Sequence, residues 1–423
     1  MKVVGIIAEY NPFHNGHKYQ LDQLKEKTGA DYIIIAMSGN FLQRGVPALC
    51  DKHTRTKMAL SCGADLVLEL PTLWATASAE YFAQGGVKLL EHTGVVTHLG
   101  FGAETDNLRA LSSLSSILME EPTEYKEHLN VFLKKGLSFP SARKEALLET
   151  LKNHQTLPVT FDLTEINHIL DMPNNILALE YLKALPNHMT PVLIPRKGAG
   201  YHDTDLTCAL PSATAIRNAI LSDATSTTAT MLCSLEDAMP TESAQLLCDC
   251  IKQNRLIDVE DFSEILGYCL LSNASNGYEA YADCSLELSN KIRNNLKAYC
   301  GWNDFCQNLK SKDLTYTRIS RTLLHIMLNI TPNDYALGKR LNFAPYLRVL
   351  GFRKTSSDLL SAIKKEARVP MITKVSDAAS LLSKDEYLVF EKDLYASSIY
   401  HQLLTVKKKQ PPANDFTNQI VIL

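Results

Sequence analysis

Short runs of apolar residues alternate with longer amphipathic stretches along the first hundred residues of the chain. Each run is rich in β-branched residues and stops at a turn signal, which is typical of a strand buried on both faces. We expect strands at 3–8, 31–37, 64–70 and 95–101, and helices between them at about 16–27, 51–62 and 76–93. This alternation predicts an α/β fold, a parallel sheet with helices on both of its faces.

The rest of the chain favours helices. Leu and Ala recur at helical spacing over 105–190, a short apolar strand follows at 191–194, and a helix opens near Ser212. From about residue 225 the pattern is helical with few strand-like runs, although the final IVIL is typical of a short strand. We therefore expect an α/β domain at 1–225, with a helical insertion at about 105–190, and a mostly helical domain at 226–423.

Composition narrows the class of protein. Of the 423 residues, 45% are hydrophobic and 21% are charged, which argues against long disorder and fits two globular domains. No apolar stretch reaches 18 residues and the first apolar run is too short for a signal peptide, so we expect no membrane segment. The ten cysteines form no CxxC pair, which favours free thiols in the cytoplasm and no metal site built by the protein.

Charge is unevenly distributed along the chain. Residues 291–423 carry 21 basic and 11 acidic side chains, whereas residues 1–290 carry 22 basic and 35 acidic ones. Such asymmetry predicts a polyanionic partner for the basic part, with a solvated helical face as the alternative. The candidate contacts are Arg318, Arg321, Arg348, Arg353, Lys354, Lys407, Lys408 and Lys409.

The motif His14-Asn15-Gly16-His17 follows the first strand directly. A helix beginning there has its N-terminus at the carboxyl edge of the sheet, where open α/β sheets bind ligands and where free N–H groups suit phosphate. Gly16 lets a ligand approach the backbone, and the two imidazoles share one face of the helix. Two imidazole donors in this place would stabilise charge on a phosphoryl group in transfer.

A second phosphate-type motif lies far downstream, at Pro211-Ser212-Ala213-Thr214-Ala215-Ile216-Arg217. Hydroxyl and amide groups at a helix start, with a guanidinium one turn later, suit the β- and γ-phosphates of a nucleotide. The two motifs, in this order and on these elements, resemble the HxGH and Ile-Arg signatures of the nucleotidylyltransferase superfamily. That resemblance implies a Rossmann-like domain that binds ATP and forms an adenylate with loss of pyrophosphate.

Within that superfamily the chain resembles the tRNA(Met) cytidine acetate ligases over nearly its whole length. The resemblance implies that ATP activates acetate to acetyl-adenylate, and that the acetyl group then passes to N4 of the wobble cytidine (C34) of elongator tRNA(Met). The segments that carry it include AEYNPFHNGHKYQL (8–21), MSGNFLQRGVPA (37–48), GADLVLELP (63–71), GFGAE (100–104), PNNILALEYLKAL (173–185), GAGYHD (198–203), SATAIR (212–217), TYTRISR (315–321) and YLRVLGF (346–352).

The same resemblance implies roles for individual residues. His14 and His17 would be catalytic, and Mg²⁺ would accompany the ATP. The implied ATP contacts are Ile7, Ala8, Glu9, Tyr10, Asn11, Pro12, Phe13, His14, Asn15, Gly16, His17, Lys18, Tyr19, Gln20, Gly102, Asn175, Arg196, Ser212, Thr214 and Arg217. Asn174 is an alternative to Asn175, because either amide could instead cap the helix that follows.

Two further groups have open alternatives. Ser38-Gly39-Asn40 follows the second strand on the ligand side of the sheet, where it could bind acetate or form a plain turn. Glu69, near the end of the third strand, could hold Mg²⁺ beside the triphosphate or serve as a structural hydrogen-bond acceptor.

Two other functions compete with the ligase hypothesis. One is a small-molecule adenylyltransferase of the same superfamily, which is typically a much shorter chain and would leave the basic C-terminal third without a purpose. The other is a non-catalytic RNA-binding relative, against which the intact His14, Gly16, His17 and Arg217 argue. No residue in the sequence identifies itself as the base for the second, acetyl-transfer step.

Overall fold

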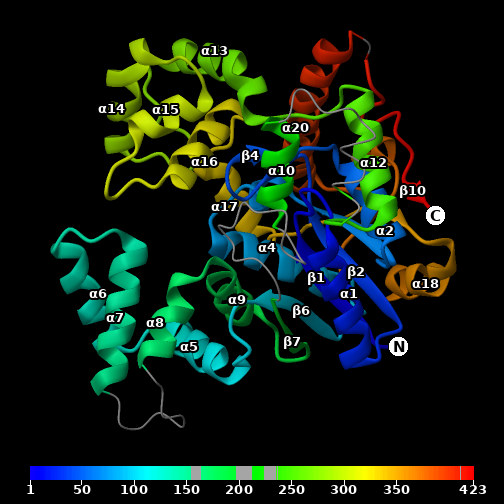
Figure 1. Cartoon of the computed structure of the whole chain (residues 1–423), viewed down its shortest axis with the longest axis horizontal. Coiled ribbons are helices and arrows are strands. Elements are labelled where there is room, and N and C mark those ends of the chain that lie inside the picture. Colours follow the sequence, from blue (N-terminus) through cyan, green and yellow to red (C-terminus); the bar gives the residue numbers. More distant parts are fainter. Residues whose placement is uncertain (154–162, 197–211, 223–234, 236, 410) are drawn as a thin grey trace.

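A single mixed sheet lies at the centre of the computed structural model, which describes residues 1–153, 163–196, 212–222, 235, 237–409 and 411–423 (Figure 1). The strand order is β10-β8-β5-β2-β1-β6-β7, with β9 paired to β8. The strands are β1 (Val3–Ala8), β2 (Tyr32–Ser38), β5 (Leu66–Leu70), β6 (His98–Ala103), β7 (Thr190–Pro195), β8 (Leu347–Phe352), β9 (Met371–Ile372) and β10 (Val421–Ile422). A separate two-residue hairpin is formed by β3 (Phe41–Leu42) and β4 (Val46–Pro47).

The five strands predicted in the N-terminal half are all present and run parallel, which confirms the α/β fold. The predicted terminal strand is present as β10. The structure differs at β8, which follows the expected domain boundary by more than a hundred residues yet pairs antiparallel with β5. The run LRVLGF is almost wholly buried and has no helical period, so it completes the sheet of the N-terminal half. The C-terminal part of the chain therefore contributes to the sheet as well as supplying helices.

Helices cover both faces of the sheet, because alternate strand residues belong to two separate cores. Ile33 and Ile35 of β2 pack with α1 (Asn15–Thr28), α2 (Lys52–Ser61) and α12 (Thr241–Lys252). Ile34 and Ala36 of the same strand face the opposite way, toward α4 (Ala79–His92) and the larger core. Period-2 alternation across a doubly covered strand explains why the sequence shows one unbroken apolar run.

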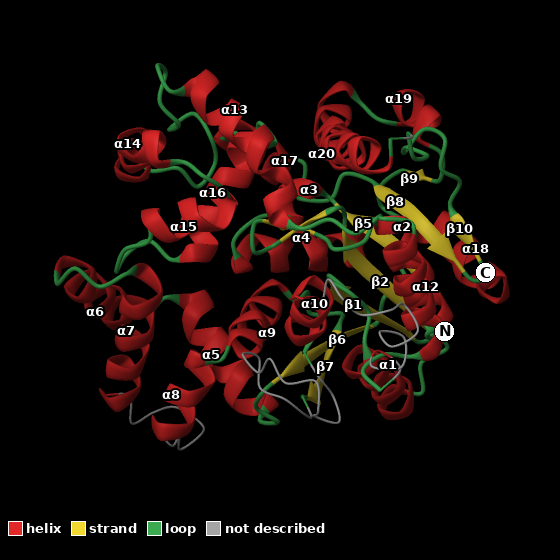
Figure 2. Cartoon of the chain, turned by 45° about the horizontal axis from the view of Figure 1, so that its top comes forward, coloured by secondary structure: helices red, strands yellow, loops and turns green. Residues whose placement is uncertain are grey.

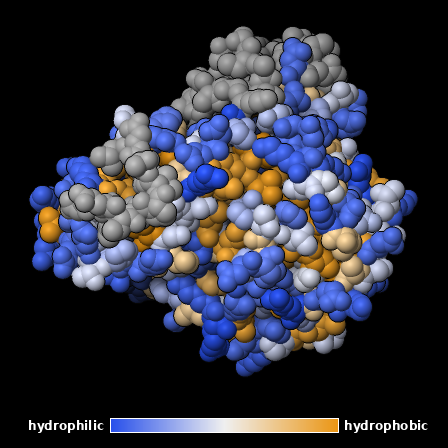
Figure 3. Space-filling view, turned by 90° about the horizontal axis from the view of Figure 1, so that it is seen from below, coloured by the Kyte–Doolittle hydropathy of each residue, from blue (hydrophilic) through white to orange (hydrophobic). Residues whose placement is uncertain are grey.

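The remaining helices form groups around this centre (Figure 2). Between β6 and β7 the chain forms α5 to α9, of which the α6–α7 pair stands away from the sheet in both ribbon views (Figures 1 and 2). On the face drawn in Figure 3, hydrophilic and hydrophobic side chains intermingle. No helix in the described ranges is long and apolar enough to cross a membrane. The bounds are α3 (Thr72–Ala75), α5 (Leu108–Glu120), α6 (Thr123–Lys134), α7 (Phe139–Asn153), α8 (Leu163–Asp171), α9 (Pro173–Ala184), α10 (Ala213–Ser222), α13 (Ser263–Asn273), α14 (Leu286–Asn295), α15 (Trp302–Leu309), α16 (Tyr316–Met327), α17 (Pro332–Arg340), α18 (Ser357–Glu366), α19 (Ala378–Leu381) and α20 (Lys384–Lys408).

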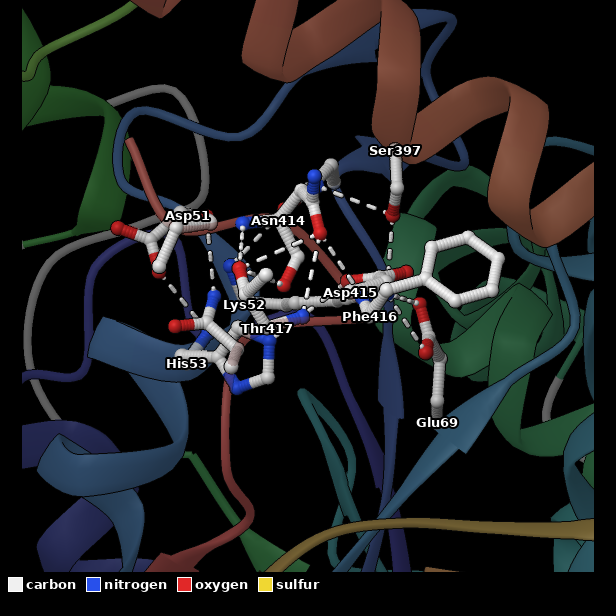
Figure 4. Close-up of polar contacts among 12 residues, drawn as sticks. Asp51, Lys52, His53, Glu69, Ser397, Asn414, Asp415, Phe416 and Thr417 are labelled. Atoms are coloured by element: carbon white, nitrogen blue, oxygen red, sulfur yellow. Dashed lines mark hydrogen bonds and ion pairs between the residues drawn. The ribbon is translucent and has the colours of Figure 1, made fainter. Parts of the chain in front are cut away.

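A buried ion-pair cluster connects the C-terminal helix and tail to the sheet (Figure 4). Lys52 at the start of α2 is fully buried, and its Nζ lies 2.7 and 2.8 Å from the two carboxylate oxygens of Glu69 on β5. The same Nζ donates to Ser397 Oγ on α20 at 2.9 Å and to Asp415 Oδ2 in the tail at 2.8 Å. The Glu69 carboxylate is therefore a structural acceptor, which decides between the two roles considered for it.

Candidate active site

A cleft of about 360 Å³ opens at the carboxyl ends of β1 and β6, the edge at which open α/β sheets bind ligands. Its other walls come from the β3–β4 hairpin, α4, α9 and the start of α10. The lining residues are Ile7, Ala8, Glu9, Tyr10, Asn11, His14, His17, Gln20, Leu42, Gln43, Arg44, Val46, Ala79, Phe82, Phe101, Gly102, Pro173, Asn174, Ile176, Leu177, Tyr181, Arg196, Ser212, Ala213, Thr214 and Arg217.

The cleft brings together most of the residues that the sequence analysis selected for ATP. The predicted residues that line it come from both motifs and from the segments between them. They are Ile7, Ala8, Glu9, Tyr10, Asn11, His14, His17, Gln20, Gly102, Arg196, Ser212, Thr214 and Arg217. Six others in the stretch 7–20 do not line it, namely Pro12, Phe13, Asn15, Gly16, Lys18 and Tyr19. The ring of Phe13 does not reach the cleft because it is fully buried in the core beneath α1.

Both histidines are fixed by hydrogen bonds to the backbone at the start of α1. The Nδ1 atom of His14 accepts from the N–H of Gly16 at 3.1 Å, and the Nδ1 atom of His17 accepts from the N–H of His14 at 3.2 Å. The two rings lie 3.8 Å apart between centroids. Because each Nδ1 is an acceptor, the proton of each neutral ring is on Nε2, so both side chains present an N–H donor.

Electrostatics keep these two rings neutral. Burial, with the positive charges of Arg196 and Arg217, lowers the pKa of His14 to about 3. Burial, with His14 and Arg196, lowers the pKa of His17 well below its usual value. At neutral pH the site therefore offers two uncharged imidazole donors beside two guanidinium groups, which suits a polyanionic ligand.

The absence of a side chain at Gly16 leaves room for the His14 ring. A Cβ added at residue 16 would lie 2.9 Å from Cε1 and 3.1 Å from Nδ1 of His14, closer than the neighbouring ring can accommodate without moving. The glycine in the motif is therefore required for the position of the His14 imidazole.

The second motif meets the first across the cleft. Ser212 caps α10 by accepting from the N–H of Ala215 at 3.1 Å. Arg217, one turn into α10, donates through Nη1 to the carbonyl of Asn11 at 2.7 Å and through Nη2 to Thr214 Oγ1 at 3.1 Å. The guanidinium is thus held at the loop that precedes α1, so the two motifs meet at this point of the cleft.

The two asparagines at the start of α9 divide their roles. Asn174 lines the cleft and donates to Glu104 Oε1 at 2.6 Å. Asn175 is fully buried, and its Oδ1 accepts from the N–H groups of Glu104 at 2.9 Å and Thr105 at 3.1 Å. Neither amide caps the helix, since Met172 occupies the N-cap position. Asn174, the alternative considered for this position, is the one that reaches the cleft.

The loop Ser38-Gly39-Asn40 does not line the cleft. Arg55 donates to the carbonyl of Ser38 at 3.1 Å and to that of Gly39, and the Oδ1 of Asn40 accepts from the N–H of Lys52 at 2.9 Å. Ser38 and Asn40 are both buried. The geometry gives this loop a scaffolding role and does not support the acetate-binding alternative.

The candidate tRNA contacts fall into three groups. Arg348 is 3% exposed and lies against Glu69 and the ring of Phe390, so burial removes it from the set. Arg321 and Lys407 form ion pairs with Asp283 at 3.3 Å and with Asp261 at 2.7 Å. Lys354 and Lys409 are exposed, and Arg318, Arg353 and Lys408 are half-buried. The family segment at 198–203 lies outside the described residues.

The sequence analysis did not select the apolar wall of the cleft. Leu42 and Val46 on the β3–β4 hairpin, Phe82 on α4 and Tyr181 on α9 come from three separate parts of the chain. Each has the pattern of an ordinary core residue, and only the tertiary structure places them opposite the two motifs. The β3–β4 hairpin follows β2 at the ligand-binding edge of the sheet. That position was the one signal in the sequence that could have pointed to this wall.

Comparison with known proteins identifies a family. The family model HIGH Nucleotidyl Transferase matches residues 1–415. The tRNA(Met) cytidine acetate ligase of Thermoanaerobacter sp. (strain X514) is 39% identical over 427 residues, covering 100% of both chains. The protein of the same name from Clostridium perfringens (strain SM101 / Type A) is 40% identical over 407 residues, covering 95% of each chain.

Solved structures agree with this assignment. The crystal structure of apo Thermotoga maritima TmcAL (form I) has a TM-score of 0.91 and 32% sequence identity, and covers 100% of both chains. The structure of the same protein bound with alpha-thio ATP has a TM-score of 0.88 and 31% identity, again over 100% of both chains. The chain therefore belongs to the HIGH nucleotidyl transferase family and, within it, to the tRNA(Met) cytidine acetate ligases.

Proposed function

We propose that this chain is an ATP-dependent ligase that acetylates N4 of the wobble cytidine (C34) of elongator tRNA(Met). The observation that carries the proposal is the meeting of the two motifs at one cleft, where neutral His14 and His17 face the guanidinium groups of Arg196 and Arg217. Relatives matched over the full chain are named for this reaction, and a solved relative binds an ATP analogue. A tRNA substrate also leads us to propose a cytoplasmic location.

In the first step, an acetate oxygen attacks the α-phosphorus of ATP and pyrophosphate leaves. The Nε2–H groups of His14 and His17 donate to the phosphate oxygens as charge develops, and they need no reorganisation because both rings are fixed by the backbone. Ser212, Thr214 and Arg217 hold the β- and γ-phosphates until pyrophosphate departs. Mg²⁺ enters with ATP as part of the substrate, with phosphate oxygens and water among its ligands.

In the second step, the amine of the wobble cytidine attacks the acetyl carbonyl and AMP leaves. Placing the base against the mixed anhydride is mainly a task of positioning. Of the predicted RNA contacts, Arg318, Arg353, Lys354, Lys408 and Lys409 keep some solvent exposure and, unlike Arg321 and Lys407, form no ion pair within the described residues. We retain these five for the tRNA backbone.

Labelled acetate provides the test. The protein is incubated with labelled acetate, ATP, Mg²⁺ and bulk tRNA, and the tRNA is digested to nucleosides. The proposal predicts label in N4-acetylcytidine, and its loss in a variant that combines His14→Ala with His17→Ala. Pyrophosphate exchange that requires acetate would separate the ligase from an adenylyltransferase that acts on a phosphate ester. Absence of label from tRNA together with absence of acetate-dependent exchange would refute the proposal.

A further inference from the structure

One acidic side chain lines the cleft among the residues that the structure describes there, and it is Glu9. The other charged or titratable side chains that line the cleft include His14, His17, Arg44, Arg196 and Arg217. ATP and acetate are both anions, so a carboxylate in this cleft opposes their binding. A carboxylate in this cleft is therefore best explained if it binds a substrate group that donates a hydrogen bond or a proton.

Glu9 is fixed from two sides at the carboxyl end of β1. Its Oε1 accepts from the backbone N–H of Gln43 at 2.8 Å, and its own carbonyl accepts from Arg55 Nη1 at 2.6 Å. Within the described ranges, the Gln43 bond is the only hydrogen bond to the carboxylate, and no lysine or arginine lies within ion-pair distance of it, although its charge acts on the nearby Arg55. The carboxylate therefore retains most of its capacity to accept hydrogen bonds.

The carboxylate lies beside the β3–β4 hairpin, which brings both Leu42 and Arg44 to the cleft. Burial raises the pKa of Tyr181, and the negative charge of Glu9 raises it further, which places the carboxylate toward α9. The Gln43 bond ties it to the β3–β4 hairpin, where Leu42 lines the same wall.

This combination matches the chemistry of a cytosine. Carboxylates accept from the N4 amine of cytosine, and apolar and aromatic side chains suit the flat face of an unstacked base. We propose that Glu9 accepts a hydrogen bond from the N4 amine of the wobble cytidine and takes its proton during acetyl transfer. The inference rests on the proposed function and supplies a proton acceptor for its second step.

The proposed step moves the acetyl group and one proton. The lone pair on N4 forms the C–N bond to the acetyl carbon, and the C–O bond to the phosphate of AMP breaks with its electron pair staying on AMP. One proton leaves N4 for the Glu9 carboxylate, which later releases it to water. A uridine would present its O4 acceptor to the same carboxylate, so Glu9 also disfavours the wrong pyrimidine at this position.

Glu9→Gln tests the proposal, because it keeps the shape of the side chain and an oxygen for Gln43 while removing the charge. Hydroxylamine, a strong nucleophile, traps acetyl-adenylate as acetohydroxamate without needing a base, and so reports the first step alone. Single-turnover acetylation of tRNA reports both steps. We expect the rate of tRNA acetylation to fall about 100-fold further than the rate of acetohydroxamate formation, because a general base is lost. In steady-state assays, kcat should fall and KM for tRNA should rise.

Glu80→Gln is the matched control, since Glu80 is an exposed carboxylate on α4, next to the wall residue Ala79 but not lining the cleft. This variant should leave both rates unchanged. Equal losses of both products in Glu9→Gln, or a higher Mg²⁺ requirement for acetohydroxamate formation, would overturn the inference and assign Glu9 to ATP activation. Unchanged tRNA acetylation would also overturn it. Failure of the wild-type protein to form acetohydroxamate or to acetylate tRNA would instead refute the proposed function.

Discussion

The Nδ1 atom of His17 accepts a hydrogen bond from the backbone N–H of His14, with 3.2 Å between the two nitrogens. Together with the bond from Gly16 to His14, this makes a capping box in which both side-chain acceptors are imidazoles. Two donors at the start of α1 are thereby satisfied, and the same bonds aim the Nε2–H groups. Helix capping and phosphate binding use opposite nitrogens of one ring, so the two roles can be separated by mutation.

His14→Asn should separate them. Asparagine is a good N-cap and can accept from the N–H of Gly16, so we expect the free energy of unfolding to stay near that of the wild type. Acetate-dependent ATP–pyrophosphate exchange should fall by about 10²- to 10³-fold, because the Nε2–H donor is gone. His14→Ala should lose the same activity and, in addition, about 1 kcal/mol of stability with the cap. Exchange retained within a few-fold in His14→Asn would show that His14 acts only as a cap.

Gly16→Ala should lower activity without a matching loss of stability. Alanine is favoured over glycine in a helix by about 1 kcal/mol, yet the new Cβ would displace the His14 ring. Displacing the ring also weakens the cap on the Gly16 N–H, which offsets the helical preference for alanine. We therefore expect the melting temperature to stay near that of the wild type while the exchange rate falls at least about tenfold, as misplacement of a catalytic group does. Gly29→Ala is not a suitable control because Gly29, the C-cap of α1, has φ +62°. Glu26→Ala, at an exposed position of α1 outside the predicted site, is the control. Full activity in Gly16→Ala would contradict the positioning role of this glycine.

The ion pairs of Lys52 hold the C-terminal segment around Asp415 against strand β5. Burial disfavours the charged form of Lys52, but Asp415 and Glu69 outweigh that effect and raise its pKa. Lys52→Met would leave two carboxylates buried without their cation, which costs about 3–5 kcal/mol. Lys57→Met on the same helix removes an exposed charge and should change the free energy of unfolding by less than about 0.5 kcal/mol. Equal unfolding midpoints in urea for these two variants would contradict the account.

Asp393 on α20 should make stability depend on pH. Burial and the charge of Glu69 raise the pKa of this carboxyl to about 7, while Tyr346 and Thr72 donate to it at 2.6 Å each. Between its unfolded pKa of about 3.9 and pH 7, the folded state holds a proton that the unfolded chain has lost. The free energy of unfolding therefore falls as pH rises through this window, by at most about 1.4 kcal/mol per pH unit from this group.

Asp393→Asn removes that contribution. The free energy of unfolding of the variant, minus that of the wild type, should rise from pH 4 to pH 7 and level off above it. Denaturant titrations of both proteins across this range give the difference. A difference that stays constant from pH 4 to pH 8 would show that Asp393 ionises normally in the folded protein.

The polar half of the site was predictable because its chemistry lies in two short motifs. His14 caps the start of α1, and His17 and Arg217 lie in the first turns of α1 and α10, and local pattern fixes such positions. The apolar wall and the Lys52 cluster were not predictable in the same way, since their members meet only in the folded chain. Asp415, for example, is 363 residues from Lys52. Strand β8 was missed because a short apolar run within a helical region has no periodicity of its own.

Oxygen transfer from acetate to AMP tests the central claim most directly. If an acetate oxygen attacks the α-phosphorus at the His14–His17 site, [¹⁸O]acetate must leave one of its labelled oxygens on AMP when the acetyl group passes to tRNA. The account predicts AMP that carries a single ¹⁸O atom for each N4-acetylcytidine formed, as read by mass spectrometry. Unlabelled AMP, or label found in inorganic phosphate instead, would contradict acetyl-adenylate as the intermediate.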